Sequence, residues 1–220
     1  EKEQLYNYLT IPRGGQFFVK LSDGTEVWLN SESKLKYPIV FGEGLTRKVE
    51  LIYGEAYFKV SPSTMHKGAA FHLLTKSQEI DVLGTEFNVK AYNGDTTMAT
   101  TLVEGKIKKG TLSETLIPNQ QATISHESDK IDVEVIDVSQ EISWVKGLFS
   151  FNEKPLEEIM TVLSRWYDTE VIFENAKQKK FVFTGILERT KAVEDILNLI
   201  EATSEGQLKF EINDKTIYIK

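Results

Sequence analysis

The feature that most constrains the fold is a series of short segments, from residue 16 to about residue 138, in which apolar and polar residues alternate. A period of two is typical of strands with one buried face, because successive side chains point to opposite faces. Turn-forming residues separate the segments, as at Ser22-Asp23-Gly24, Asn93-Gly94-Asp95 and Ser128-Asp129. Many short strands without an intervening helical period predict a mainly β domain over 16–142, either an antiparallel sandwich or a rolled meander.

The pattern changes after residue 143, where apolar residues recur every three or four positions. This period predicts a helix from about Leu156 to Tyr167, with Pro155 in its first turn, and a second helix over 190–203 with Thr190 as its N-cap. Strand-like segments flank both helices, at 147–151, 170–175, 180–185, 208–213 and 216–220. We therefore expect residues 143–220 to form a smaller α+β subdomain, with both helices on one face of a sheet.

Composition excludes several classes of function. The 220 residues carry a formal net charge of −7 and contain only short basic runs, so nucleic acid is not an expected partner. The absence of cysteine removes disulfides, thiolate metal sites and cysteine nucleophiles. No apolar run reaches the roughly 18 residues that a membrane-spanning helix needs. The given chain is therefore expected to be soluble.

Motifs for catalysis or cofactor binding are missing. The three histidines, His66, His72 and His126, do not have the spacing that places two metal ligands on one helix face. No glycine-rich phosphate loop and no Gly-x-Ser-x-Gly motif occurs. We expect no metal, no cofactor and no enzymatic turnover.

Aromatic residues leave two interpretations open in the β domain. Trp28, Tyr37, Tyr53, Tyr57 and Phe58 fit cross-strand pairs and a core. They could instead form a stacking platform, in which case the chain would be a carbohydrate- or small-ligand-binding β-domain of the cell envelope. Burial of these rings would remove that alternative.

A second aromatic group brackets the start of the α+β subdomain. Trp144, Trp166 and Tyr167 are expected to pack at the junction of the two domains. The alternative is that their rings are exposed and anchor a partner, since Trp and Tyr are favoured at protein interfaces.

Two alternating segments begin with the same tripeptide, Gly24-Thr25-Glu26 and Gly84-Thr85-Glu86. Glycine before a strand indicates a bulge or a close approach of another backbone, while threonine suits the strand itself. This repeated Gly-Thr start is expected to be structural.

Four segments in order resemble signature segments of the FecR family of anti-sigma factors. They are LSDGTEVWLN, LIYGEAYFKV, VLGTEFNVKAY and TLVEGKIKKG. The later segments PLEEIMTVLSRWYDTEVIFEN and FTGILERTKAVEDILNLI resemble the companion domain of Bacteroidetes-type members, which is similar to the short N-terminal domain of secretins and TonB-dependent receptors.

The resemblance implies a periplasmic sensor region of an inner-membrane protein. Its partner would be the signalling domain of a TonB-dependent outer-membrane receptor. The sigma factor would bind a cytoplasmic segment that is missing here, as is the membrane helix, so residues 1–15 would be the spacer behind that helix. One route to receptor binding is addition of a receptor strand to an exposed edge of the C-terminal sheet, at FVFTG or TIYIK.

The resemblance also implies a candidate self-cleavage bond, Gly84-Thr85, because some FecR-type proteins are thought to cut themselves at a Gly-Thr bond. The threonine hydroxyl would attack the preceding carbonyl, and glycine would keep that carbonyl uncrowded. A base is also required, and His72 is the nearest histidine in the sequence. Cleavage and the structural interpretation both remain open for this pair.

Overall fold

The computed structural model describes residues 4–109, 115–126 and 130–220. The chain forms two compact units that divide between Glu141 and Ile142. We call them the N-terminal unit and the C-terminal unit. The expected turn at Ser128-Asp129 lies outside the described residues. No helix in the described ranges is long and apolar enough to cross a membrane.

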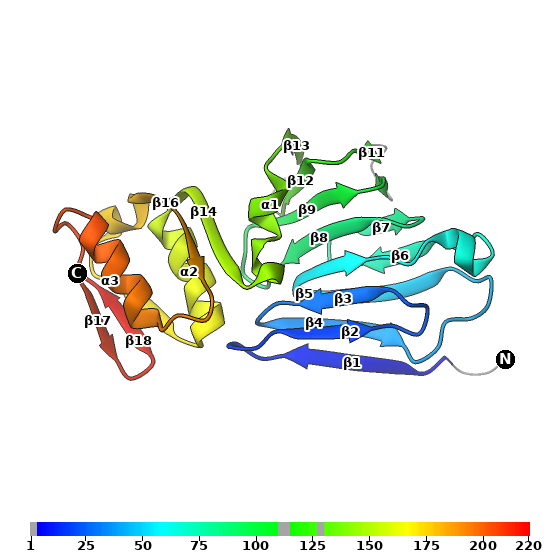
Figure 1. The fold of residues 1–220 in the computed structure, drawn as a ribbon, viewed down its shortest axis with the longest axis horizontal. Coiled ribbons are helices and arrows are strands. Elements are labelled where there is room, and N and C mark those ends of the chain that lie inside the picture. Colours follow the sequence, from blue (N-terminus) through cyan, green and yellow to red (C-terminus); the bar gives the residue numbers. More distant parts are fainter. Residues whose placement is uncertain (1–3, 110–114, 127–129) are drawn as a thin grey trace. The chain divides into compact units, whose positions relative to one another are not determined.

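The N-terminal unit is built from one 13-stranded sheet and two short helical turns (Figure 1). The strands are β1 (Tyr6–Ile11), β2 (Phe17–Lys20), β3 (Glu26–Leu29), β4 (Ser33–Pro38), β5 (Arg47–Lys59), β6 (Phe71–Leu74), β7 (Glu79–Val82), β8 (Glu86–Ala91), β9 (Thr97–Glu104), β10 (Ile107–Lys109), β11 (Thr115–Leu116), β12 (Gln120–Ser125) and β13 (Ile131–Val135), and the turns are η1 (Ser63–His66) and α1 (Val138–Glu141).

The long strand β5 belongs to both halves of this sheet. Its first half pairs with β4 and β6, whereas its second half pairs with β3 and β8. The strand changes its pairing partners at Gly54, which has a φ of 101°. Gly54 lies so close to β4 that a Cβ there would be 2.2 Å from the Ser33 Oγ. Only glycine fits there, because other residues would clash and rarely adopt that φ.

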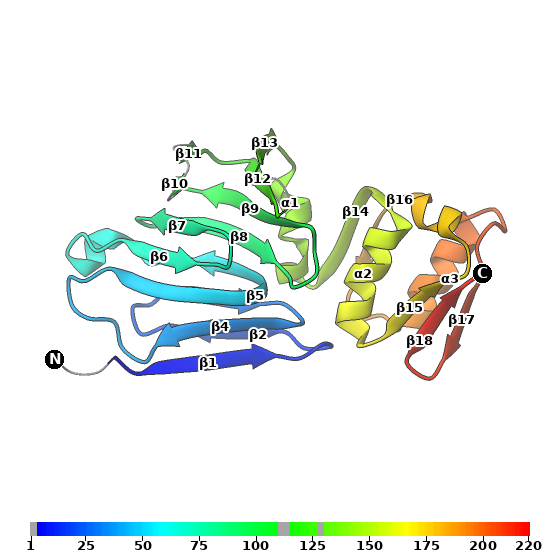
Figure 2. The same ribbon diagram turned by 180° about the vertical axis from the view of Figure 1, so that it is seen from behind.

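The sheet folds over at β5 and encloses the core of the unit, as the two opposite views show (Figures 1 and 2). Residues from both halves meet in this core. For example, the Phe58 ring stacks on Phe87 with ring centres 5.1 Å apart, and its centre lies 6.1 Å from that of Phe71. Neighbouring strands in the described part of this unit run antiparallel, except for β5 and β6, which run parallel. The mainly β prediction for this part of the chain is confirmed.

Part of the segment 1–15, which was expected to be a spacer, belongs to the sheet. Residues 6–11 form β1, which pairs antiparallel with β4 over its whole length. The sequence did not predict this strand, because aromatic or apolar residues lie on both of its faces. Tyr6 and Tyr8 lie on the exposed face, while Ile11 lies on the other face and is buried.

The C-terminal unit has the expected α+β composition. It contains η2 (Ser143–Lys146), β14 (Leu148–Pro155), α2 (Leu156–Tyr167), β15 (Glu170–Phe173), η3 (Ala176–Lys180), β16 (Val182–Glu188), α3 (Val193–Thr203), β17 (Phe210–Asn213) and β18 (Thr216–Ile219). The strands form two sheets, β14-β16 and β15-β18-β17, so the expectation of one sheet beneath both helices is wrong. Strand pairing is a long-range property that periodicity does not fix.

Both helices bury the faces that their apolar period predicts. In α2 the buried residues are Leu156, Ile159, Met160 and Leu163, and in α3 they are Ile196, Leu197 and Ile200. Helix α3 begins later than expected, so Thr190 is not its N-cap. That position is taken by Ala192, which makes no capping hydrogen bond.

Candidate functional site

Gly84 and Thr85 lie at the start of β8, against the segment that follows β5. The Val60 amide donates to the Thr85 carbonyl at 3.0 Å. Gly84 has a φ of 146°, and a Cβ there would lie 3.0 Å from the Pro62 Cα. The glycine is therefore explained by the close approach of another backbone.

The Thr85 hydroxyl is buried and donates to the Lys106 carbonyl at 3.3 Å. His72, the nearest histidine in sequence, instead has its ring nitrogens directed at Asp81 and Glu79. The geometry thus gives the hydroxyl a backbone acceptor in place of a general base. Self-cleavage at Gly84-Thr85 stays a prediction that requires a measurement.

The second Gly-Thr pair, Gly24-Thr25, contacts the same segment after β5. Thr25 is fully buried, and its hydroxyl donates to Asp23 at 2.8 Å while accepting from the Ser61 amide at 3.2 Å. Gly24 has a φ of 85°, and a Cβ there would lie 3.8 Å from the Ser61 Oγ. The two pairs recur because two strands begin against one segment, residues 60–62.

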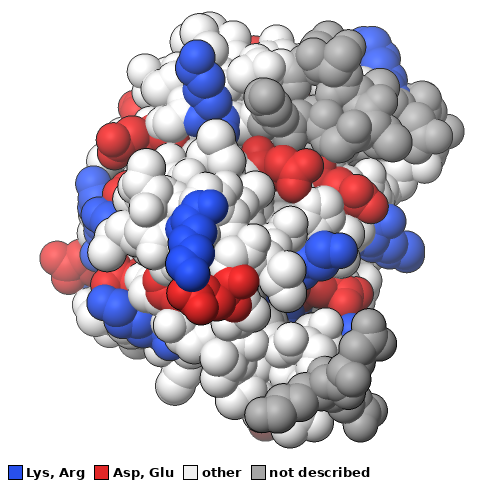
Figure 3. Space-filling model, turned by 90° about the vertical axis from the view of Figure 1, so that its right-hand side faces the viewer, with Lys and Arg blue, Asp and Glu red and all other residues white. Residues whose placement is uncertain are grey.

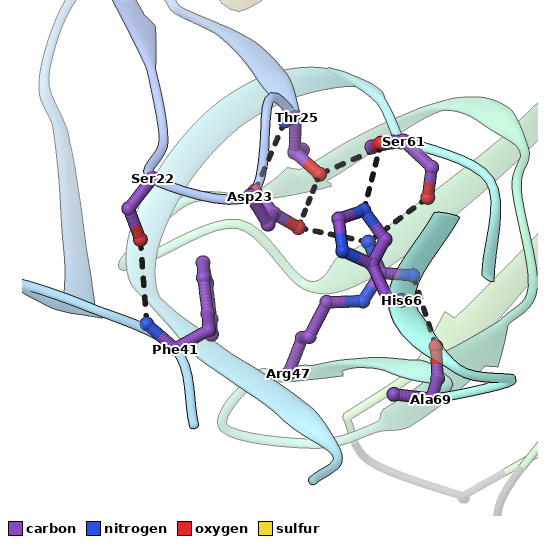
Figure 4. Close-up of polar contacts among 8 residues, drawn as sticks. All are labelled: Ser22, Asp23, Thr25, Phe41, Arg47, Ser61, His66 and Ala69. Carbon is purple, nitrogen blue, oxygen red and sulfur yellow. Dashed lines mark hydrogen bonds and ion pairs between the residues drawn. The ribbon is translucent and has the colours of Figure 1, made fainter. Parts of the chain in front are cut away.

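The largest fully buried side chain of the described residues is charged. Arg47 is 1% exposed, and its Nη1 lies 2.8 Å from a carboxylate oxygen of Asp23, whose side chain is 2% exposed (Figure 4). The same nitrogen donates to the Ser61 carbonyl at 2.9 Å, and Nη2 donates to the Ala69 carbonyl at 3.1 Å. One guanidinium thus joins three loops at one end of the sheet.

A cleft of about 280 Å³ opens beside this ion pair. Its walls are the turn at 22–23, the loop 40–45 and the end of η1. The His66 Nε2 lies 2.9 Å from the Ser61 Oγ, and Figure 4 shows the imidazole ring beside the Arg47 guanidinium. An exposed ion pair of 2.6 Å between Lys67 and Glu43 connects η1 with the loop. We call these features together the Arg47 cleft.

The fold and the order of its units match a known family. FecR protein matches residues 7–108, within the N-terminal unit, and the FecR C-terminal domain matches residues 148–219, within the C-terminal unit. The chain belongs to the FecR family. Its two units are thus a FecR domain and a FecR C-terminal domain, as the ordered sequence segments indicate.

Solved structures resemble this FecR protein over nearly its whole length. Two crystal structures, each of a candidate anti-sigma factor from Parabacteroides distasonis ATCC 8503, superpose with a TM-score of 0.84. They are 27% and 28% identical to it, and the alignments cover 97% and 98% of this chain and 98% of each of those chains. No curated protein matches the chain significantly.

The five aromatic residues of the FecR domain do not form one platform. Phe58 lies in the core, and Tyr37 packs against it. Trp28 and Tyr57 form a cross-strand row with Phe18, at ring distances of 4.8 and 5.5 Å. Tyr53 pairs with β4 in the other half of the sheet. These contacts fit the interpretation as cross-strand pairs and core, and they do not favour the alternative of a shared stacking face.

Tyr57 is held by hydrogen bonding as well as by packing. Its ring is buried, and its hydroxyl donates to Glu86 at 2.6 Å. Burial, followed by this hydrogen bond, raises the pKa of Tyr57. A ring fixed in this way contributes to the sheet and presents little surface to a sugar.

The second aromatic group packs inside the C-terminal unit. Trp144 is buried, and the Arg189 guanidinium lies 3.7 Å from the centre of the Trp166 ring. The Trp166 indole donates to the Arg189 carbonyl at 3.0 Å, and the Tyr167 hydroxyl donates to the Lys191 carbonyl at 2.7 Å. Burial raises the pKa of Tyr167 to about 12. These contacts fit a packing role.

Metal chemistry finds no support in the described part of the chain. It contains no group of three His, Asp or Glu side chains that could hold an ion. The histidines lie apart in their contacts: His66 is bound to Ser61, His72 to Asp81, and His126 to Ser77.

Sequence reasoning missed the Arg47 cleft, although one signal was present. In the segment that forms β5, Arg47 occupies the same phase of the alternation as Val49 and Leu51, which are buried. A charged residue in the apolar phase predicts a buried ion pair. Its partner, Asp23, lies 24 residues away and could not be identified from spacing.

Proposed function

We propose that this chain is the periplasmic sensor portion of a transmembrane anti-sigma factor. It binds the signalling domain of a TonB-dependent outer-membrane receptor and relays substrate occupancy to an extracytoplasmic-function sigma factor. The observation that carries this proposal is the pairing of the two FecR matches, over 7–108 and 148–219, in one chain. The likeness to the candidate anti-sigma factors of P. distasonis supports it.

In this proposal the sigma factor and the receptor are bound by different parts of the protein. The sigma factor binds a cytoplasmic segment, and a membrane helix connects that segment to the sensor portion. The 220 residues therefore act by binding protein in the periplasm, without catalytic turnover and without contacting nucleic acid.

The C-terminal unit offers a strand edge for the receptor at β16. Among the described residues this strand pairs with β14 alone, and its residues Val182 and Ile186 are 56% and 69% exposed. A Cβ on Gly185 would meet nothing within 4 Å. An edge strand that presents apolar residues is a template for another strand, which would add main-chain hydrogen bonds.

The other strand of this sheet, β14, is protected in ways that β16 is not. The end of β14 carries Lys154, Pro155 and a bulge at Glu153, whose φ is 49°. Charges, proline and bulges are common protections of edge strands. The TIYIK segment, the other site expected from the sequence, forms β18 at the centre of its sheet and has no free edge.

Calorimetry with purified signalling domains of the organism's TonB-dependent receptors tests the proposal. We expect the chain to bind at least one of these domains. The double substitution Val182→Lys and Ile186→Lys should weaken that binding at least about tenfold, because lysines block strand addition. The matched control is Val133→Lys with Val135→Lys on β13, an edge strand of the N-terminal unit with exposed valines.

The outcomes separate the function from the docking strand. Failure of the unsubstituted chain to bind any receptor signalling domain would contradict the proposed function. Binding that survives both lysines on β16, or that is lost equally in the β13 control, would contradict only the assignment of β16.

A further inference from the structure

The rim of the Arg47 cleft is apolar and exposed. Val40, Leu45 and Met65 line it, and they are 63%, 67% and 75% exposed. Two come from the loop 40–45 and the third from η1, so separate segments bring them together. Single exposed apolar residues are ordinary, but a group around a cleft marks a binding surface.

The floor of the cleft offers polar groups that the described residues leave without partners. Arg47 lines the cleft, and its buried Nε has no hydrogen-bond partner among the described residues. The His66 Nε2 is occupied by Ser61, whereas Nδ1 has no partner in the described ranges. A buried donor without a partner is costly, and a bound ligand would remove that cost.

The charges around the cleft are already balanced. Asp23 neutralises Arg47 on the floor, and Glu43 pairs with Lys67 at the rim. Figure 3 shows basic and acidic side chains interspersed with uncharged residues at this end of the N-terminal unit. A cleft with balanced charges favours a neutral ligand over an anion.

The hydrogen bonding of His66 further limits which ligands the cleft can bind. If Nε2 of His66 accepts from Ser61, Nδ1 carries the proton and donates; if Nε2 donates, Nδ1 accepts. An amide has both a carbonyl and an N–H, so it can pair with either tautomer. A carboxylate can only accept.

We propose that the Arg47 cleft binds one aliphatic residue of an extended peptide segment from a partner protein. The aliphatic side chain lies among Val40, Leu45 and Met65, and the peptide amides pair with Arg47 and His66. The volume of about 280 Å³ is just below the usual range for ligand sites and suits a single residue. This site is separate from β16 and gives the chain a second protein contact.

Titration of the full, isotope-labelled chain with N-acetyl-leucine-N-methylamide, followed by NMR, tests the proposal. We expect saturable shifts at the Arg47 Nε–H and the Met65 methyl, with a dissociation constant of about 1 mM for so small a probe. N-acetyl-glycine-N-methylamide lacks the aliphatic side chain and should bind at least about fivefold more weakly. N-acetyl-leucine, which is a carboxylate, should also bind more weakly.

Two rim variants and one control complete the test. Leu45→Ser and Met65→Ser should each weaken binding of the leucine probe about threefold or more, and both sites are exposed enough to leave the fold intact. Leu83→Ser, at a 62% exposed leucine outside the cleft, should not change it. Absence of saturable shifts, equal affinity of the glycine probe, tighter binding of the carboxylate, or unchanged affinity in both rim variants would overturn the proposal.

Discussion

At the scale of single residues, Arg47 connects sequence, fold and candidate site. It begins β5 in the apolar phase of the alternation, and its guanidinium reaches Asp23, Ser61 and Ala69. A buried charge is tolerated when it is paired and hydrogen-bonded. Removing either member of the pair would leave the other buried and uncompensated.

We therefore expect Arg47→Ala to lower the free energy of unfolding by about 3–5 kcal/mol, as measured by urea denaturation. The control is Lys20→Ala, which breaks an exposed ion pair with Glu26 and should cost less than about 1 kcal/mol. Equal losses in the two variants would contradict the stabilising role of the buried pair.

The Gly84-Thr85 bond permits a decisive mass measurement. Because the Thr85 hydroxyl donates to a backbone carbonyl, we expect purified protein to remain one chain of 25.0 kDa. Two fragments that meet between Gly84 and Thr85 would instead establish self-cleavage. In that case Thr85→Ala should abolish the cut.

Tyr167 predicts a pH dependence. Burial raises its pKa from 10.0 to about 12 in the folded chain. Since the folded value is the higher one, the stability that this group contributes is complete below pH 10 and is lost as the pH rises to about 12. Absorbance of tyrosinate should show a step near pH 12 that is missing in Tyr167→Phe. A Tyr167 step near pH 10 would contradict the burial argument.

At the scale of elements, alternation predicted strands well because many have one more deeply buried face, as β3 and β6 do. It could not predict that β5 exchanges partners at Gly54, since the required φ and the contact with Ser33 exist only in the fold. Both helices were predicted from their periods, but the start of α3 was not, because Ala192 gives no capping signal.

The uncapped start of α3 leads to a prediction of its own. Ala192 has the extended backbone of an N-cap, with φ −66° and ψ 150°, but no oxygen in its side chain. Ala192→Ser should raise the free energy of unfolding by about 1 kcal/mol in urea denaturation. Ala202→Ser, near the exposed end of the same helix, should lower it slightly. A loss of stability in Ala192→Ser would contradict the capping argument.

At the scale of the whole molecule, the two units have different proposed contacts. The FecR domain carries the Arg47 cleft, which sequence spacing could not predict because its residues lie on three separate loops. The C-terminal unit carries β16, one of the two segments that the sequence suggested for strand addition; the other, β18, could not be distinguished from it before the strand order was known. The receptor partner is a proposal that rests on the family resemblance, and β16 and the Arg47 cleft are the proposed contact sites.

The central claim is that a receptor signalling domain binds this sensor through β16. Hydrogen exchange of the chain, alone and in complex with that domain, tests it most directly. We predict that backbone amides over 182–187 become protected in the complex, while those of β18, already paired on both sides, change little. Protection confined to the N-terminal unit, or no protection over 182–187 in a saturated complex, would contradict the account.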